Sequence, residues 1–313
     1  MRAVWLRRFG GPEVLRVEGT TDPEPGAGQV LIDIERTSLT FVETQVRAGR
    51  APFPVELPII PGNGVGGMVI AAGPGADDAL VGQRVVTTTG GSGGHAELVL
   101  VDANLPIVVP DGLSLDDATA LLADGRTAMM LLDAVPVGSG DRVAVLAAAG
   151  GLGTLLLQGA LAAGADVVGV AGGDRKTRLV EALGAAAADH TRSDWQQPLG
   201  MPDVVFDGVG GSLARLAFAT MRPGGRIVSY GMASGEWAGL EPSVLAERQV
   251  TSIGLPAPSP EQARELSRRA LDAANDGRLA PVVGQRFPLD GIARAHEAVE
   301  ARATLGKTLL TVG

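Results

Sequence analysis

The chain has 313 residues, a length typical of about two domains. Hydrophobic residues make up 45% and charged residues 19%, so the chain can form a packed core and an intrinsically disordered protein is excluded. The net charge is −9, and the sequence shows no basic patch of the kind that a nucleic-acid-binding protein needs, which argues against nucleic acid as a partner. Cysteine is absent and histidine occurs three times, so neither disulfides, thiolate catalysis nor a metal site is expected.

The first third of the chain predicts short strands separated by glycine and proline. Strand-like runs lie at 30–35, 68–72, 84–89 and 96–101. Many short strands with frequent turn signals are typical of a small β-barrel or sandwich.

The middle of the chain predicts alternating helices and strands. Ser114, followed three residues later by Asp117, is a helix-start signal, and a helix is expected from there to about 133. Strands are then expected at 142–147, 166–170, 203–207 and 226–230, with helices at 152–163, 175–183 and 212–220. The strands are apolar nearly throughout, which indicates a doubly wound parallel sheet covered by helices on both faces.

The last part of the chain changes pattern again. A proline-rich connector at 256–260 precedes expected helices at 261–276 and 291–302 and a strand at 307–312. The sequence thus predicts a doubly wound domain between an N-terminal β domain and a C-terminal segment.

One stretch resembles a membrane span, because no charged residue lies between Arg142 and Asp166. Three glycines, Gly150, Gly151 and Gly153, interrupt it, so we expect a strand, a turn and a buried helix instead. The first residues include arginines but no apolar segment after them, unlike a secretory signal. We therefore expect a cytoplasmic protein without a membrane partner.

The glycine turn is the strongest motif. It has the spacing Ala148-x-Gly150-x-x-Gly153 and stands between an expected strand and an expected helix. Glycine there lets the backbone approach a pyrophosphate and lets helix and strand pack closely, while the helix N-terminus faces the phosphates. The motif predicts dinucleotide binding; the alternative is a tight turn that binds nothing.

The end of the second expected strand bears on the choice between NAD and NADP. Val170, Ala171 and Gly172 carry no acid for a ribose hydroxyl. Arg175, Lys176 and Arg178 follow, and such cations suit a 2′-phosphate, which favours NADPH over a merely solvated helix face.

The whole chain resembles the zinc-free quinone oxidoreductase branch of the medium-chain dehydrogenase/reductase family. The resemblance rests on segments that follow in family order, at 9–18, 22–32, 57–67, 81–85, 93–98, 147–158, 203–211, 222–231 and 295–310. It implies an α/β protein with a GroES-like β-barrel catalytic domain (1–118), a Rossmann NADP-binding domain (119–254) and a C-terminal return to the catalytic domain (255–313). It also implies a homodimer that transfers hydride from NADPH to a quinone or an α,β-unsaturated carbonyl.

The predicted cofactor-binding residues combine the glycine turn with positions that match the family. Lys176 matches the lysine that meets the 2′-phosphate, and His190 stands near a family tyrosine beside that phosphate or is an ordinary loop histidine. The full set is Ala149, Gly150, Gly151, Leu152, Gly153, Gly172, Lys176, His190, Gly208, Tyr230, Gly231 and Lys307.

The substrate half departs from the family. Zinc relatives have a cysteine where Thr40 stands, and Gln45 replaces a tyrosine of the quinone reductase pattern. Thr40, Gln45 and Thr127 are the predicted catalytic residues, as hydrogen-bond donors to the developing oxyanion. Thr127 is alternatively a helix threonine that caps its own turn.

Three further residues are expected outside the chemistry. Glu43 is expected to be a solvated carboxylate, His95 a structural residue and Arg126 a surface arginine, with a substrate carboxylate or phosphate as the alternative partner of Arg126. Two other functions stay open: a reductase for one biosynthetic, polyketide-like enone, and an NADPH-binding protein without catalysis.

Overall fold

The chain folds into two compact units in a computed structural model, which describes residues 1–51 and 53–313. The β unit consists of Met1–Ala123 and Ser267–Gly313, and the Rossmann unit of Asp124–Leu266. The sequence had suggested boundaries after 118 and 254. Both boundaries between the units instead fall inside helices, α2 (Leu115–Ala134) and α7 (Pro260–Asn275). A boundary inside a helix leaves no turn signal in the sequence, so the sequence did not reveal it.

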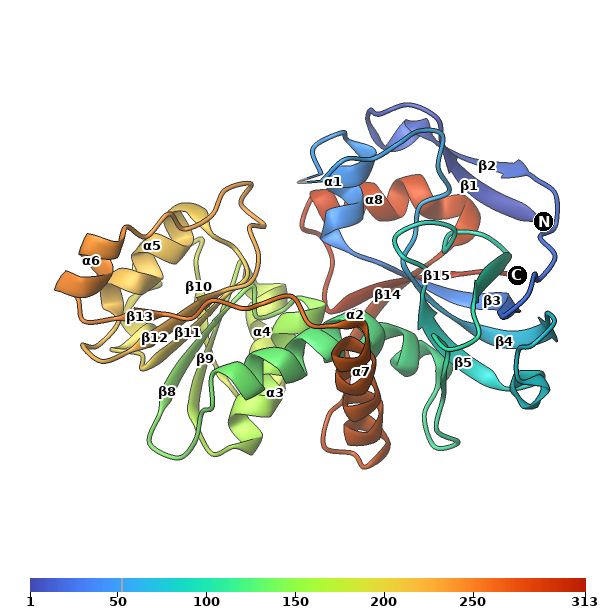
Figure 1. Cartoon of the computed structure of the whole chain (residues 1–313). Helices are drawn as coiled ribbons and strands as arrows, with labels where there is room; N and C mark the ends of the chain where they lie inside the picture. The colour runs from blue at the N-terminus through green and yellow to red at the C-terminus, as the bar shows by residue number, and fades with distance from the viewer. Residues whose placement is uncertain (52) are drawn as a thin grey trace. The chain divides into compact units, whose positions relative to one another are not determined.

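The β unit contains a mixed sheet in the order β14-β15-β3-β4-β5-β7, with β6 paired to β3 and with β1 and β2 as a separate hairpin. Figure 1 shows β15, near the C-terminus, alongside β3 from the N-terminal part. The strands are β1 (Arg2–Leu6), β2 (Leu15–Gly19), β3 (Gln29–Leu39), β4 (Gly64–Ala72), β5 (Arg84–Thr88), β6 (Leu98–Asp102), β7 (Ile107–Val108), β14 (Val283–Pro288) and β15 (Lys307–Thr311). The helices are α1 (Phe41–Arg47) and α8 (Ile292–Glu300), with short 3₁₀ helices at Pro12–Val14, Asp78–Leu80 and Leu289–Gly291.

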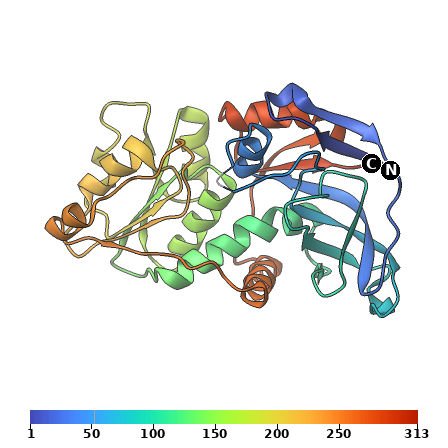
Figure 2. The same ribbon diagram turned by 45° about the horizontal axis from the view of Figure 1, so that its top comes forward.

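The Rossmann unit contains a parallel sheet in the order β10-β9-β8-β11-β12-β13. Its strands are β8 (Arg142–Leu146), β9 (Asp166–Ala171), β10 (Ala186–Asp189), β11 (Val204–Asp207), β12 (Arg226–Ser229) and β13 (Thr251–Ser252). Its helices are α3 (Gly151–Ala162), α4 (Asp174–Ala182), α5 (Gly211–Thr220) and α6 (Pro242–Glu247), with a 3₁₀ helix at Gln197–Leu199. The strand order reverses at β8, and right-handed crossovers then place α3 and α4 on one face and α5 on the other (Figures 1 and 2).

The predicted fold class is confirmed, since the central strands are buried on both faces. Val143–Leu146 and Val204–Phe206 are fully buried, as expected for strands without alternation. The uncharged stretch after Arg142 is divided into β8, a turn and α3. Within the described residues, no helix is long and apolar enough to cross a bilayer.

Some elements were not predicted. β10 has the sequence AAAD, which lacks the β-branched residues that favour strands, and it forms only by pairing with β9. β13, β14, α1 and α6 are likewise short or polar elements that depend on their neighbours for stability.

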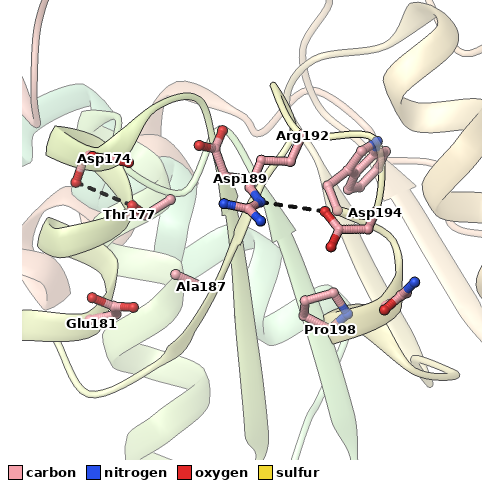
Figure 3. A pocket seen from close by; sticks show the side chains of 10 residues that line it. Asp174, Thr177, Glu181, Ala187, Asp189, Arg192, Asp194 and Pro198 are labelled. Carbon is pink, nitrogen blue, oxygen red and sulfur yellow. Dashed lines mark hydrogen bonds and ion pairs between the residues drawn. The ribbon is translucent and has the colours of Figure 1, made fainter.

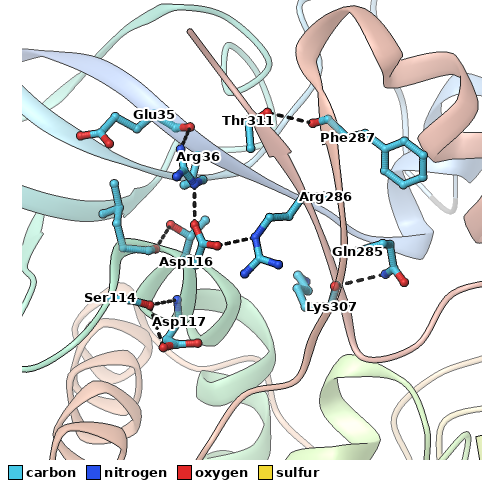
Figure 4. Close-up of polar contacts among 12 residues, drawn as sticks. Glu35, Arg36, Ser114, Asp116, Asp117, Gln285, Arg286, Phe287, Lys307 and Thr311 are labelled. Atoms are coloured by element: carbon cyan, nitrogen blue, oxygen red, sulfur yellow. Dashed lines mark hydrogen bonds and ion pairs between the residues drawn. The ribbon is translucent and has the colours of Figure 1, made fainter.

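The start of α2 shows the predicted cap and an ionic connection within the β unit (Figure 4). Asp117 donates its N–H to Ser114 Oγ at 3.0 Å. The residue before it, Asp116, accepts hydrogen bonds from Arg36 of β3 and, at 2.5 Å, from Arg286 of β14. A carboxylate on one helix therefore ties two strands from opposite ends of the sequence to that helix.

Candidate functional site

The glycine turn lies at the carboxyl end of β8 and begins α3. Ala147 is in the left-handed region with φ 55°, an unusual conformation for alanine, and its carbonyl accepts the N–H of Gly150 at 3.0 Å. A Cβ at Gly153 would come within 2.8 Å of Ala148 Cα and closer still to the Ala147 carbonyl oxygen. Only glycine therefore allows α3 to begin this close to β8.

The N-terminus of α3 is capped by Gly150 without a side-chain hydrogen bond. The N–H groups of the first turn, at Gly151, Leu152 and Gly153, have no carbonyl of their own helix to bond, as in every α-helix. This backbone arrangement, together with the helix dipole, fits a dinucleotide diphosphate.

The second part of the predicted cofactor surface surrounds the loop after β9. A Cβ at Gly172 would lie 2.7 Å from His190 Nε2, so the imidazole packs directly on this glycine. Asp189 Oδ1 accepts the N–H of Gly173 at 2.9 Å and fixes the loop. Lys176 stands in the first turn of α4, half-buried. Gly172 and His190 are therefore in contact, and Lys176 follows in the first turn of α4; the roles of these three residues toward a cofactor stay predictions.

The third part lies where β11 and β12 end. A Cβ at Gly208 would lie 2.7 Å from the Tyr230 ring, and one at Gly231 would lie 2.8 Å from the Gly208 carbonyl oxygen. Burial, with smaller contributions from Asp207 and Asp124, raises the pKa of Tyr230. The Tyr230 hydroxyl therefore keeps its proton at neutral pH, and the ring packs against the backbone of Gly208.

Asp207 organises the loop that follows β11. Its Oδ1 accepts the N–H groups of Val209 at 2.9 Å and Gly210 at 2.8 Å, and its Oδ2 accepts the Ser229 hydroxyl at 2.8 Å. The side chain is fully buried, and these bonds hold the ends of β11 and β12 together.

Lys307 is also predicted to bind the cofactor, but it belongs to the β unit, whereas the other predicted binding residues belong to the Rossmann unit. It belongs to β15 of the β unit, and only 4% of it is exposed (Figure 4). Gln285 of β14 donates to its carbonyl oxygen at 3.2 Å. The structure gives Lys307 a clear place in the sheet, and its role toward a cofactor stays a prediction.

A cavity of about 300 Å³ lies beside α4, between that helix, β10 and the segment 192–198 (Figure 3). Four carboxylates line it, at Asp174, Glu181, Asp189 and Asp194. The one arginine in its lining, Arg192, is 3.4 Å from Asp194. Such a lining repels phosphate, so the cavity is unsuited to the phosphates of a dinucleotide.

The catalytic candidates Thr40 and Gln45 belong to the β unit, where Thr40 caps the N-terminus of α1 and Gln45 lies within that helix. The Thr40 hydroxyl donates to Glu43 Oε2 at 2.9 Å. Gln45 donates to Thr44 Oγ1 at 3.0 Å and accepts from Arg50 at 3.2 Å. Both side chains therefore form hydrogen bonds with nearby residues of the chain. In this arrangement the Thr40 hydroxyl donates its hydrogen to a carboxylate and not to a substrate oxyanion.

Glu43 corrects an expectation, because it is buried rather than solvated, with 7% of it exposed. Its Oε1 lies 3.3 Å from Nε2 of His95, which is fully buried. Burial alone would raise the pKa of Glu43, but His95 and the N–H and hydroxyl of Thr40 outweigh burial and lower it. The spacing of Thr40 and Glu43 is that of a capping box, so the sequence carries a signal for the contact between these two residues, but none for the contact with His95.

Thr127 and Arg126 lie side by side in α2, at the start of the Rossmann unit. Both are half-buried. Burial lowers the pKa of Arg126, and Asp124 opposes the shift. Within the described residues, no hydrogen bond or ion pair to the Arg126 guanidinium is found, so the expected surface arginine is instead a partly desolvated cation.

Metal binding has no support in the described part of the chain, where no group of three His, Asp or Glu side chains is arranged to hold an ion.

Two family models match the chain. An alcohol dehydrogenase GroES-like domain matches 26–111, and a model described as zinc-binding dehydrogenase matches 151–272. Together with the glycine turn, they define a two-domain dehydrogenase/reductase of the nicotinamide-dependent class.

Full-length relatives identify the branch. A quinone oxidoreductase of Pseudomonas aeruginosa is 31% identical over 99% of both chains, and a 2-haloacrylate reductase of a Burkholderia species is 31% identical over 98% of both. A solved mycobacterial structure, Rv1454c complexed with NADPH, is 33% identical over 99% of both chains with a TM-score of 0.88. The chain belongs to the quinone oxidoreductase branch of the medium-chain dehydrogenase/reductase family and is an oxidoreductase.

Proposed function

We propose that the protein is a zinc-independent, NADPH-dependent reductase of a quinone or an α,β-unsaturated carbonyl compound. The observation that carries this proposal is the backbone cradle at Gly150–Gly153, where a side chain at Gly153 would collide with Ala148. The NADPH complex of the mycobacterial relative supports the same cofactor.

Different residues of the chain bind different parts of the cofactor. The first-turn N–H groups of α3 bind the diphosphate, and Lys176 with His190 meets the 2′-phosphate. When bound, NADPH supplies a hydride to the β-carbon of an enone or to a quinone. Tyr230, Gly208 and Gly231 shape the backbone surface at the ends of β11 and β12, and Thr127 orients the acceptor.

Turnover tests this proposal directly. Purified protein is assayed for NADPH oxidation with an ortho-quinone and with a cyclic enone, each with an NADH control. We expect turnover that is selective for NADPH and that persists after dialysis against a chelator. Tight NADPH binding without turnover by any acceptor would instead support the non-catalytic alternative.

Arg126 favours a second candidate, a reductase of α,β-unsaturated carboxylates. A half-buried guanidinium without a hydrogen-bonded anion among the described residues is suited to bind a carboxylate in a fork-like pair. A 2-haloacrylate, the substrate named for one relative, is such an unsaturated acid.

The test of this candidate compares an acrylate with its methyl ester. Arg126→Gln is expected to raise KM for the acid about tenfold or more, with little change for the ester, since a charged hydrogen bond contributes roughly 1.5–3 kcal/mol. Arg8→Gln, at an exposed arginine, is the control. Equal effects on acid and ester would exclude the carboxylate role.

The expected homodimer belongs to the same proposal. Light scattering on the purified protein is expected to give twice the mass of one 31.8 kDa chain.

A further inference from the structure

One carboxylate oxygen in the Rossmann unit connects two loops. Asp189 ends β10, and its Oδ1 accepts the N–H of Gly173 at 2.9 Å, the N–H of Thr191 at 3.0 Å and the Thr191 hydroxyl at 2.8 Å. Gly173 belongs to the loop between β9 and α4, whereas Thr191 belongs to the loop that follows β10. Three hydrogen bonds to a single oxygen therefore tie these two loops together.

The two loops leave the sheet from neighbouring strands. β9 and β10 pair in parallel, with Asp189 opposite Ala171, and the His190 N–H continues this pairing to the Ala171 carbonyl oxygen at 3.0 Å. Both loops therefore start at the carboxyl edge of the sheet, which is the edge at which doubly wound domains bind their ligands.

Each loop leads to one of the residues that we predict to meet a 2′-phosphate. Gly173 has a positive φ of 81°, which favours glycine, and its carbonyl oxygen accepts the Lys176 N–H at 3.0 Å. His190 directly follows Asp189, and its imidazole packs on Gly172. Asp189 is therefore adjacent to His190 in the chain and connected to Lys176 through Gly173.

The hydrogen bonds of Asp189 suit it to hold the loops. The backbone N–H groups of Gly173 and then of Thr191 lower the pKa of Asp189 and outweigh the burial that opposes them, so the side chain is an ionised acceptor at neutral pH. In NAD enzymes the acid that binds the ribose 2′-hydroxyl ends the second strand, which corresponds to β9 here, whereas Asp189 ends the third strand, β10. Its place in the sheet therefore differs from that of a ribose-binding acid.

We propose that Asp189 is a positioning residue for cofactor choice, which holds the two loops so that Lys176 and His190 meet the 2′-phosphate of NADPH. The inference rests on the proposed function, in which these two residues bind that phosphate. Because NADH lacks the 2′-phosphate, release of the two loops lowers the affinity for NADPH and leaves the affinity for NADH nearly unchanged. In this role Asp189 contacts neither cofactor and acts through the loops.

Asp189→Ala tests the proposal, because it removes the accepting oxygen and leaves Lys176 and His190 in the chain. Fluorescence titrations with NADPH and with NADH should show an affinity for NADPH that is about tenfold weaker and an affinity for NADH that changes less than about twofold. Asp189→Asn retains an accepting oxygen and should keep the preference for NADPH. In a variant that already carries Lys176→Ala and His190→Ala, Asp189→Ala should change the affinity for NADPH less than about twofold, because its effect passes through those residues.

Asp194→Ala is the matched control and should bind both cofactors as the wild type does. This carboxylate lines the same cavity as Asp189 (Figure 3), but it pairs with Arg192 at 3.4 Å. Three results for a folded Asp189→Ala variant would overturn the role of Asp189: an unchanged preference, equal losses for both cofactors, or a loss confined to NADH. A wild type that does not prefer NADPH would instead overturn the cofactor of the proposed function.

Thr191 provides a second test if Asp189→Ala does not fold. Thr191→Val, at an exposed residue, removes one of the three hydrogen bonds to Asp189, and Thr191→Ser retains it. We expect valine to weaken NADPH binding about threefold without a change for NADH, and serine to restore it. The same ratio of NADPH to NADH affinity in both variants would overturn the proposal.

Discussion

Asp207 and Glu43 are both buried carboxylates, one in each unit, and their surroundings differ in kind. Asp207 receives two backbone N–H groups and a serine hydroxyl, and these bonds fix a loop. Glu43 receives the Thr40 N–H and hydroxyl on one oxygen and faces an imidazole with the other. Both oxygens of Asp207 are engaged in hydrogen bonds, whereas one oxygen of Glu43 faces the His95 imidazole at 3.3 Å without a hydrogen bond of good geometry to a described residue.

The same contrast runs through the two units. In the Rossmann unit the candidate binding surface is made mainly of backbone, at the ends of β8, β9, β11 and β12. In the β unit the notable polar groups are buried side chains, Glu43, Arg47, His95 and His296. A backbone surface needs small residues at fixed places, while a side-chain cluster needs a supporting fold.

The largest expected effect comes from breaking the backbone surface. Gly153→Ala forces a Cβ against Ala148 and should weaken NADPH binding about 100-fold, or about 2.7 kcal/mol, because the N-terminus of α3 must shift. A fluorescence titration measures the affinity. Gly138→Ala is the matched control, since nothing lies within 4 Å of a Cβ there. Equal affinities for the two variants would show that the turn does not form the phosphate site.

The side-chain cluster is expected to make stability sensitive to acid. Burial lowers the pKa of His296 from 6.5 to about 3, so between these values the unfolded chain binds a proton that the folded chain does not. Stability then rises with pH in this window, and acidification from pH 7 to pH 5 should cost about 2 kcal/mol. Urea unfolding at both pH values measures the loss.

His296→Leu sharpens that test, because leucine cannot titrate and the loss between pH 7 and pH 5 should largely vanish. His190→Ala, at an exposed histidine of the Rossmann unit, should keep it. An undiminished pH dependence in His296→Leu would contradict the neutral buried imidazole.

A smaller effect separates the two nicotinamide cofactors. Lys176→Ala should weaken NADPH binding about tenfold, or about 1.4 kcal/mol, and NADH binding hardly at all, because only NADPH carries the 2′-phosphate. Lys176→Arg keeps the charge and should retain the preference. Equal losses for both cofactors would exclude the 2′-phosphate role.

The smallest effect concerns the cap of α2. Ser114→Ala removes the oxygen that accepts the Asp117 N–H and should lower the unfolding free energy by about 1 kcal/mol. Ser114→Thr retains a hydroxyl and should recover most of the loss in the same denaturation experiment. If alanine were as stable as threonine, the cap would contribute nothing.

Sequence reasoning succeeded where local chemistry decides the structure. Gly153 and Ser114 have roles that follow from their immediate neighbours, so the turn after β8 and the start of α2 were both predictable. The apolar strands β8 and β11 likewise follow from their own residues.

Sequence reasoning failed where distant residues meet. Thr37 and His95 are 58 positions apart, and only the sheet brings their side chains within 3.0 Å. No local pattern reports that a carboxylate such as Glu43 is buried beside a histidine. The burial of Lys307 in β15 has the same origin, because the neighbours of that strand come from elsewhere in the chain.

The position of β15 in the sheet also bears on how the protein is made. This strand lies between β14 and β3, yet it is synthesised after the whole Rossmann unit, which is one continuous segment. The Rossmann unit can therefore fold on the ribosome before β15, which pairs with β3, has been synthesised. Until β15 emerges, residues 36–39 of β3 offer unpaired N–H and C=O groups on that side, so the nascent chain is most exposed to mispairing and aggregation in its earliest-made half.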